Sequence, residues 1–272
     1  MARDFSKNTA NYVSLGANRL NPLLAGAARI SVHAWINVDS YSAGMSDNRV
    51  LGVQFDNSNG SALLLLIDGS GANKVVRLYA RSQLETLQTR AGLVNVSTGA
   101  WHGVGGVIDF PGDTIRPYLD GAADNPGGVS FGAASYTPGT PTTATDVVGA
   151  NIAPPTGANF QLDGRIAELA LWRDDIGAAG FAALGQGFSP LLVRPQALVF
   201  YLPLRGYGGA GGPEIVPRGG GTATIGGSVP VATHPRGFGP AGATAVSPPG
   251  VSGWPLHLEA FALPVLSPGL IS

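Results

Sequence analysis

The chain has 272 residues, a formal net charge of −1 and no cysteine. Disulfides and thiolate metal sites are therefore excluded, and no basic surface is expected for nucleic acid or an anionic membrane. Charged residues make up only 12% of the sequence, whereas glycine and proline number 41 and 21, so we expect many turns and few long helices.

The first two hundred residues have the pattern of β-strands. In the segment 28–39, apolar residues occupy every second position, which is the period of a strand with one buried face. Further strands separated by turn residues are expected over 12–16, 50–56, 61–68, 74–81, 101–110, 114–121, 145–151, 161–172 and 197–204. Strands that recur at short intervals with turn residues between them favour an all-β sandwich or jelly roll.

One short helix is expected over 174–188. The segment starts with two aspartates, and Ile176, Phe181 and Leu184 have the spacing of one helical face. Its glycines make it a weak helix by itself, so packing against the sandwich must hold it.

The segment 236–272 has a different composition. It begins as a Pro/Gly-rich linker and ends as an apolar arm, whose candidate interaction residues are Trp254, Leu256, Leu258, Phe261, Leu263, Val265 and Leu266. We expect this arm to pack, either on its own domain as a closing strand or on a neighbouring subunit. No apolar run is long enough to span a bilayer, and residues 1–16 lack the apolar region of a secretory signal.

Several segments, taken in order, resemble the laminin-G-like, concanavalin-A-like jelly-roll family. They are "DFSKNTANYVSLG" (4–16), "ISVHAWIN" (30–37), "WHGVGGVID" (101–109), "IRPYLDGA" (115–122), "FQLDGRIAELALWRDDI" (160–176) and a closing segment with "LVFYLPLRG" (198–206) and "VPRGGGTATIGGSVPVATHP" (216–235). The resemblance implies a concanavalin-A-like jelly-roll β-sandwich over 1–235 with one short helix. The extended C-terminal arm over 236–272 lies outside the resemblance. In this family the position of Glu168 is usually structural.

Catalytic patterns are absent from the sequence. Jelly-roll glucanases carry two or three acids in a short run on one strand face, but here Asp163 and Glu168 are five residues apart and should face opposite sides, while Glu85 and Glu214 are isolated. No G-x-S-x-G sequence supports a serine nucleophile. We expect His102, which follows Trp101, to be structural. We therefore predict no enzyme activity and no cofactor.

Two kinds of ligand remain open. Some family members bind calcium at the rim of the sandwich, and the candidate oxygens here belong to Asp56, Asn57, Asp68, Asp109, Asp120 and Asp146. A sugar needs exposed aromatic rings, and the available ones are Trp35, Tyr41, Tyr79, Trp101, Tyr118 and Trp172. Tyr41 is the best glycan candidate because it lies in a predicted loop.

Three functions follow as hypotheses. The first is a structural protein of a bacteriophage virion, made in the host cytoplasm: a capsid decoration protein, or a head or tail fibre, that forms a homo-oligomer such as a trimer and binds a capsid lattice. This hypothesis rests on the resemblance, the missing signal and the apolar arm. The alternative is a carbohydrate-binding, lectin-like module for adhesion. A glycoside hydrolase is the third and weakest hypothesis.

Overall fold

The computed structural model describes residues 2–5, 11–41, 47–55, 61–82, 86–139, 144–150, 161–206 and 209–233. The chain divides into two units, Met1–Gly239 and Pro240–Ser272, and every described residue belongs to the first. The predicted arm, with its candidates from Trp254 to Leu266, lies outside the described residues, so its role and the boundary at 235 stay predictions.

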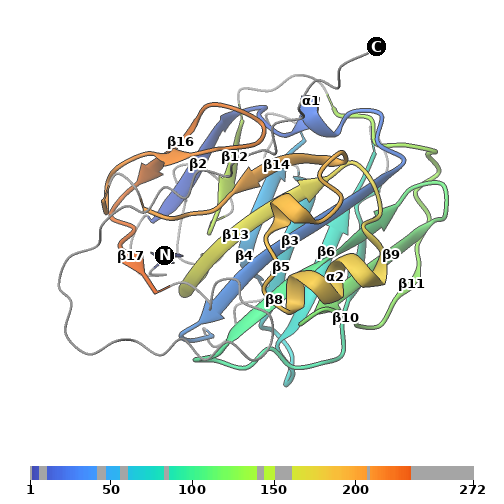
Figure 1. Cartoon of the computed structure of the whole chain (residues 1–272). Helices are drawn as coiled ribbons and strands as arrows, with labels where there is room; N and C mark the ends of the chain where they lie inside the picture. The colour runs from blue at the N-terminus through green and yellow to red at the C-terminus, as the bar shows by residue number, and fades with distance from the viewer. Residues whose placement is uncertain are drawn as a thin grey trace, which may run out of the picture. The chain divides into compact units, whose positions relative to one another are not determined.

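The described part is a sandwich of two antiparallel sheets, as the sequence predicts (Figure 1). In the first sheet the strands follow the order β10-β9-β8-β3-β13-β1-β17, with β11 beside β9 and β14 beside β13. Their bounds are β1 Ala2–Phe5, β3 Arg29–Val38, β8 Trp101–Asp109, β9 Thr114–Leu119, β10 Ala122–Ala123, β11 Gly127–Gly128, β13 Gly164–Trp172, β14 Leu198–Leu202 and β17 Val231–Ala232.

The second sheet follows the order β15-β16-β2-β12-β4-β5-β6-β7. Its bounds are β2 Tyr12–Ala17, β4 Asp47–Gln54, β5 Ser61–Asp68, β6 Val75–Ala80, β7 Gln88–Ala91, β12 Thr145–Val148, β15 Glu214–Ile215 and β16 Thr222–Gly226. Each of the ten strands expected from the sequence is present, which confirms the all-β prediction.

The main core lies between the two sheets. Along β3 the residues Ile30, Val32, Ala34, Ile36 and Val38 all point into it and are almost completely buried, as their alternation predicts. The opposite residues of the same strand face away from this core, onto the outer face of the first sheet.

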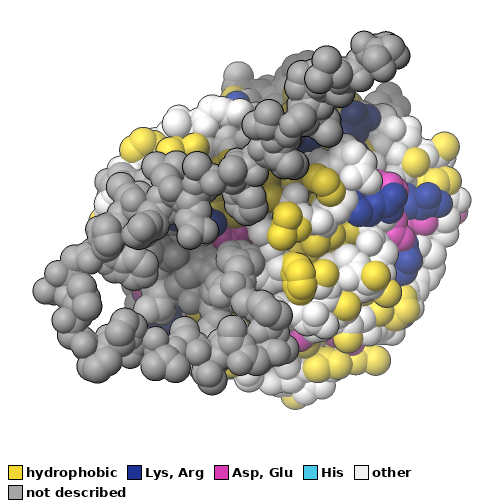
Figure 2. Space-filling model, viewed as in Figure 1, with side chains coloured by type: hydrophobic (Ala, Val, Ile, Leu, Met, Phe, Trp, Pro, Cys, Tyr) yellow, Lys and Arg dark blue, Asp and Glu magenta, His cyan; other side chains and the backbone are white. Residues whose placement is uncertain are grey.

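The predicted helix is α2, Gly177–Gly185, and it lies on that outer face (Figure 1). Under it a second apolar cluster forms, in which the rings of Tyr118 and Phe181 stack with centroids 3.9 Å apart. Asp175 accepts a hydrogen bond from the N–H of Gly177, so an acid does stabilise the helix start. Figure 2 shows further apolar side chains around α2 on this face.

Two short helical segments were not predicted. One is α1, Asn21–Leu24, a single turn with Pro22 in its first turn, and the other is the 3-10 turn η2, Pro190–Leu192. In the ranges that the structure describes, no helix combines the length and the apolar character needed to cross a membrane.

Strand β13 departs from the alternation that its sequence suggests. Its pairing with β3 shifts by one residue between Ala167 and Ala170, and Glu168 takes a left-handed backbone conformation with φ of 53°. This β-bulge removes the simple relation between spacing and sheet face, so the prediction that Asp163 and Glu168 face opposite sides loses its basis. The first residue of the strand is Gly164. No side chain fits at this position, because a Cβ would lie 2.1 Å from the carbonyl oxygen of Asn37.

Candidate functional site

The outer face of the first sheet carries a row of aromatic and polar side chains beyond the part that α2 covers. Along β3 this row consists of His33, Trp35 and Asn37, and the neighbouring strand β8 adds Trp101 opposite Asn37. We call these four residues the aromatic row. All four come from regular strand alternation, so their positions are fixed by the rigid sheet rather than by a loop.

Trp35 and Trp101 are both partly exposed. Trp35 lies opposite Gly103, where an added Cβ would be 3.8 Å from the indole ring and 3.1 Å from the imidazole of His33. The glycine therefore leaves room for both rings to lie against the sheet. The rings of His33 and Trp35 meet edge to face, with centroids 6.1 Å apart.

Two buried polar atoms of the aromatic row have no hydrogen-bond partner among the described residues. They are Nδ1 of His33 and Oδ1 of Asn37. Burial lowers the pKa of His33 to about 3, although the negative charge of Asp120 acts in the opposite direction. Native proteins rarely leave buried polar atoms unpaired, so these two atoms indicate a place where water or a ligand completes the bonding.

A charged group lies next to the aromatic row. Arg165 on β13 pairs with Asn37 across the sheet, and its guanidinium lies 3.4 Å from the carboxylate of Asp4 and 3.2 Å from that of Asp39. All three side chains are between a quarter and a half exposed. The surface next to the aromatic row therefore presents two carboxylates that share one described cation, the guanidinium of Arg165.

Tyr41, the predicted glycan residue, lies elsewhere. Its ring packs against the core between the sheets, its hydroxyl donates to the carbonyl oxygen of Val96 at 2.9 Å, and burial raises its pKa. The ammonium of Lys74 is 5.9 Å from the ring centroid. Tyr41 is thus not part of the aromatic row, and its role in sugar binding stays a prediction.

The other predicted aromatic residues separate into two groups. Tyr118 and Trp172 are buried under α2, where they pack and cannot stack on a ligand. Tyr79 lies on the second sheet, partly exposed, and its hydroxyl accepts a hydrogen bond from Arg77 at 3.1 Å.

The candidate calcium ligands do not converge in the described residues. Asp68 pairs with Arg77, Asp109 pairs with Arg29, and Asp146 is buried, whereas Asp56 and Asn57 lie outside the described residues. Asp120 bonds to His102. Within the same residues no group of three or more His, Asp or Glu side chains could hold a metal ion.

The acidic side chains that a glycosidase would need either have partners already or lie outside the described residues. Glu168 is buried and accepts a hydrogen bond from the hydroxyl of Tyr201. Glu214 is buried and paired with Arg3. Glu85 lies outside the described residues.

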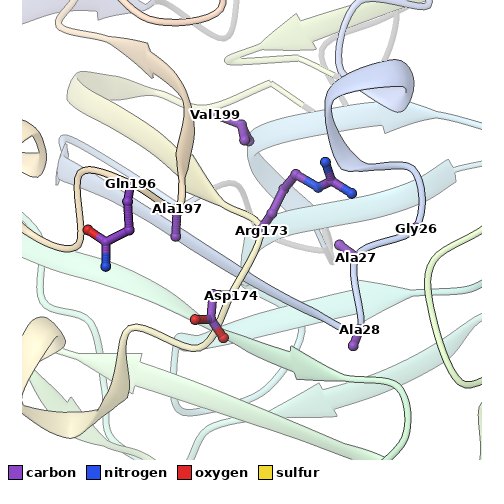
Figure 3. A pocket seen from close by; sticks show the side chains of 8 residues that line it. All are labelled: Gly26, Ala27, Ala28, Arg173, Asp174, Gln196, Ala197 and Val199. Carbon is purple, nitrogen blue, oxygen red and sulfur yellow. The ribbon is translucent and has the colours of Figure 1, made fainter.

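A pocket of about 360 Å³ lies between the residues after α1 and the end of β13 (Figure 3). In Figure 3 the side chains of Arg173 and Asp174 point in different directions. Arg173 donates to the carbonyl oxygen of Ala25 at 2.7 Å and Asp174 pairs with Arg194 at 3.0 Å. Because both charged groups have partners and the remaining lining is mostly alanine and glycine, this pocket offers a ligand less than the aromatic row does.

Comparisons with known proteins agree with this fold. A crystal structure of a candidate carbohydrate-binding protein from Bacteroides ovatus ATCC 8483 is 17% identical, with a TM-score of 0.61; the match covers 85% of this chain, which spans 59% of that protein's length. The heptameric SAP-like pentraxin from Limulus polyphemus is 11% identical over 67% of this chain and 78% of its own, with a TM-score of 0.49.

A third similar structure is the CBM40 module of the Ruminococcus gnavus IT-sialidase bound to α2,3 sialyllactose, at 13% identity over 68% of this chain and 96% of its own, with a TM-score of 0.48. No curated protein matches the sequence. The Laminin_G_3 family model matches residues 7–179, and the chain therefore belongs to the concanavalin A-like lectin/glucanases superfamily.

Proposed function

We propose that this chain is a carbohydrate-binding domain whose sugar stacks on Trp35 and Trp101. The observation that carries the proposal is the aromatic row: two partly exposed indoles on adjacent strands, flanked by buried polar atoms of His33 and Asn37 without partners. A sugar ring presents C–H groups to an aromatic face and hydroxyls at its edge. A sugar site therefore needs an aromatic ring and polar groups beside it.

The charged groups next to the aromatic row favour a neutral sugar over an acidic one. The guanidinium of Arg165, which lies beside the aromatic row, is already shared by two carboxylates and is therefore not free for an acidic sugar. Asp4 and Asp39, which are partly exposed, can accept hydrogen bonds from hydroxyls. Among the described residues, the two carboxylates next to the aromatic row, Asp4 and Asp39, are both paired with Arg165, so the proposed function is binding without cleavage of the glycosidic bond.

The fold supports this proposal more than the virion hypothesis. The Bacteroides protein with the same fold is itself a candidate carbohydrate-binding protein. A role in a bacteriophage capsid or fibre has no counterpart in these similarities and depends on the arm.

A glycan array followed by calorimetry tests the proposal. We expect a neutral oligosaccharide to bind, and Trp35→Ala and Trp101→Ala each to weaken binding by about tenfold, or about 1.4 kcal/mol. Tyr79→Ala is the matched control, because it removes a partly exposed aromatic ring from the other sheet. Retained melting temperatures show that the variants fold.

Two results would contradict the proposal. If no glycan binds across a broad array, the function is wrong. If Tyr79→Ala or Tyr41→Ala abolishes binding while both tryptophan variants bind normally, the sugar lies elsewhere.

A further inference from the structure

Three side chains near the start of β8 and the end of β9 form a single hydrogen-bonded line. The hydroxyl oxygen of Ser97 lies 2.9 Å from Nε2 of His102, and Nδ1 of His102 lies 2.8 Å from Oδ2 of Asp120. Ser97 and Asp120 are exposed and His102 is partly exposed, so the line is open to solvent.

The connectivity of this line is the one that serine hydrolases use. The hydroxyl bonds to Nε2, which can take its proton, while the carboxylate bonds to Nδ1 and fixes the tautomer and the orientation of the ring.

Hydrogen bonds hold the backbone around the three residues in place. The other oxygen of Asp120 accepts a hydrogen bond from the N–H of Gly103 at 2.9 Å, which fixes the carboxylate. On either side of Ser97, the N–H of Val96 bonds to the carbonyl of Lys74 and the N–H of Gly99 bonds to that of Val38. The nucleophile and its base are therefore held by two neighbouring strands and a tied loop.

We propose that Ser97, His102 and Asp120 form an acyl-transfer site that hydrolyses small carboxylic esters. The Ser97 oxygen attacks the ester carbonyl carbon and its proton passes to Nε2 of His102. The bond from the carbonyl carbon to the alcohol oxygen then breaks, and that oxygen leaves with the proton. Water attacks the acyl-Ser97, His102 takes one water proton, and the carboxylic acid leaves as the Ser97 oxygen takes the proton back.

The substrate class is an O-acyl ester with a short acyl group, such as an acetyl ester on a sugar hydroxyl. Ser97 is exposed in the loop before β8, where a short acyl group needs no binding pocket. The carboxylate of Asp120 lies close enough to the aromatic row for its charge to act on His33, whereas Trp101 and His102, as successive residues of β8, point to opposite faces of the sheet. Ester hydrolysis does not depend on the proposed sugar binding, and the two can be tested separately.

The test uses the full chain and p-nitrophenyl acetate. Release of nitrophenolate gives the rate, and mass spectrometry of protein quenched in acid locates any acetyl group. We expect an acetyl adduct on Ser97, and a loss of about 100-fold in rate for Ser97→Ala and for His102→Gln. Asp120→Asn should also slow the reaction, since it removes the group that orients the imidazole.

Ser130→Ala is the matched control, because Ser130 is an exposed serine on the chain and belongs to no such line. It should react like the parent, and Trp35→Ala should also keep its rate on this small ester, since that ester needs no sugar platform.

Three outcomes would overturn the proposal. They are a rate no higher than that of buffer, an adduct on another residue, and a Ser97→Ala rate equal to the parent's while His102→Gln is slow. The last would show that the imidazole reacts by itself and that Ser97 only holds the loop.

Discussion

Arg3 and Glu214, 211 residues apart in the sequence, form a fully buried ion pair with Nε of Arg3 2.5 Å from Oε1 of Glu214. Arg3 also donates to the carbonyl oxygens of Gly209 and Val229, at 2.6 and 2.8 Å. The pair therefore connects β1, the first strand, to the segments that close the sandwich after β14.

Replacing Glu214 by glutamine tests this connection. Oε2 of Glu214 has no hydrogen-bond partner among the described residues, so an amide there removes the charge without breaking a described bond. The buried guanidinium of Arg3 would then lack its counter-charge, and we expect Glu214→Gln to lower the free energy of unfolding by about 3 kcal/mol, measured in urea.

Asp4→Asn is the control for that change. Asp4 is the next residue on β1, but its pair with Arg165 is 3.4 Å long and both side chains are about a third exposed. We expect a loss of less than about 1 kcal/mol. Equal losses for the two variants would contradict a special role for the buried pair.

His33 should make stability depend on pH. Its folded pKa is lowered from 6.5 to about 3, so between these values the unfolded chain binds a proton that the folded chain does not. The contribution is present above pH 6.5 and is lost as the pH falls toward 3, at about 1.4 kcal/mol per pH unit. His33→Gln should remove this dependence, and urea titrations from pH 4 to 7 measure it.

Asp146 should make stability depend on pH in the opposite direction, with stability falling as the pH rises. Burial raises its folded pKa from 3.8 to about 6, against the effect of three backbone N–H donors. Its stabilising contribution is therefore present below pH 3.8 and is lost as the pH rises toward 6. In the His33→Gln variant, stability should thus fall between pH 4 and 6, and a flat or rising curve would contradict the assignment.

The two oxygens of Asp146 also predict a clear substitution effect. Oδ2 accepts from the N–H of Leu20 and Oδ1 from that of Gln54, at 2.7 and 2.8 Å. Asp146→Asn turns one acceptor into an NH₂ group that faces a donor, so we expect a loss of about 2 kcal/mol at pH 7. A loss that vanishes at pH 7 would show that the oxygens are not both needed.

Long strands could be predicted from the sequence because their residues alternate over many positions. Strand β3 is the clearest case, with its core face from Ile30 to Val38. β1 and β7 were missed because their four residues, ARDF and QTRA, show no alternation of apolar and polar positions, and α1 was missed because it is a single turn. The bulge at Glu168 was missed because pairing with β3, rather than any local signal, creates it.

The residues of the candidate sites were harder to predict from the sequence than the long strands were. Alternation places Trp35 on the second face of β3, but it does not tell which part of that face α2 covers. Ser97, His102 and Asp120 match no spaced motif, and only the pairing of β8 with β9 brings Asp120 to His102. The two side-chain partners of His102 therefore left no sign in the sequence, and the interpretation of His102 as structural stays a prediction.

The apolar arm carries the remaining prediction, which concerns assembly. A segment with Trp254, Leu256, Leu258, Phe261, Leu263, Val265 and Leu266 gains most in water by burying these side chains, and a second subunit can provide the surface. We expect light scattering to give a closed oligomer for the full chain and a monomer for residues 1–239. A full-length variant with Leu256, Leu258 and Phe261 changed to serine is the control, since it keeps the length and should also be monomeric. If the full chain and the truncation are both monomers, or if both form the same oligomer, the arm does not join subunits, and the virion hypothesis loses its main support.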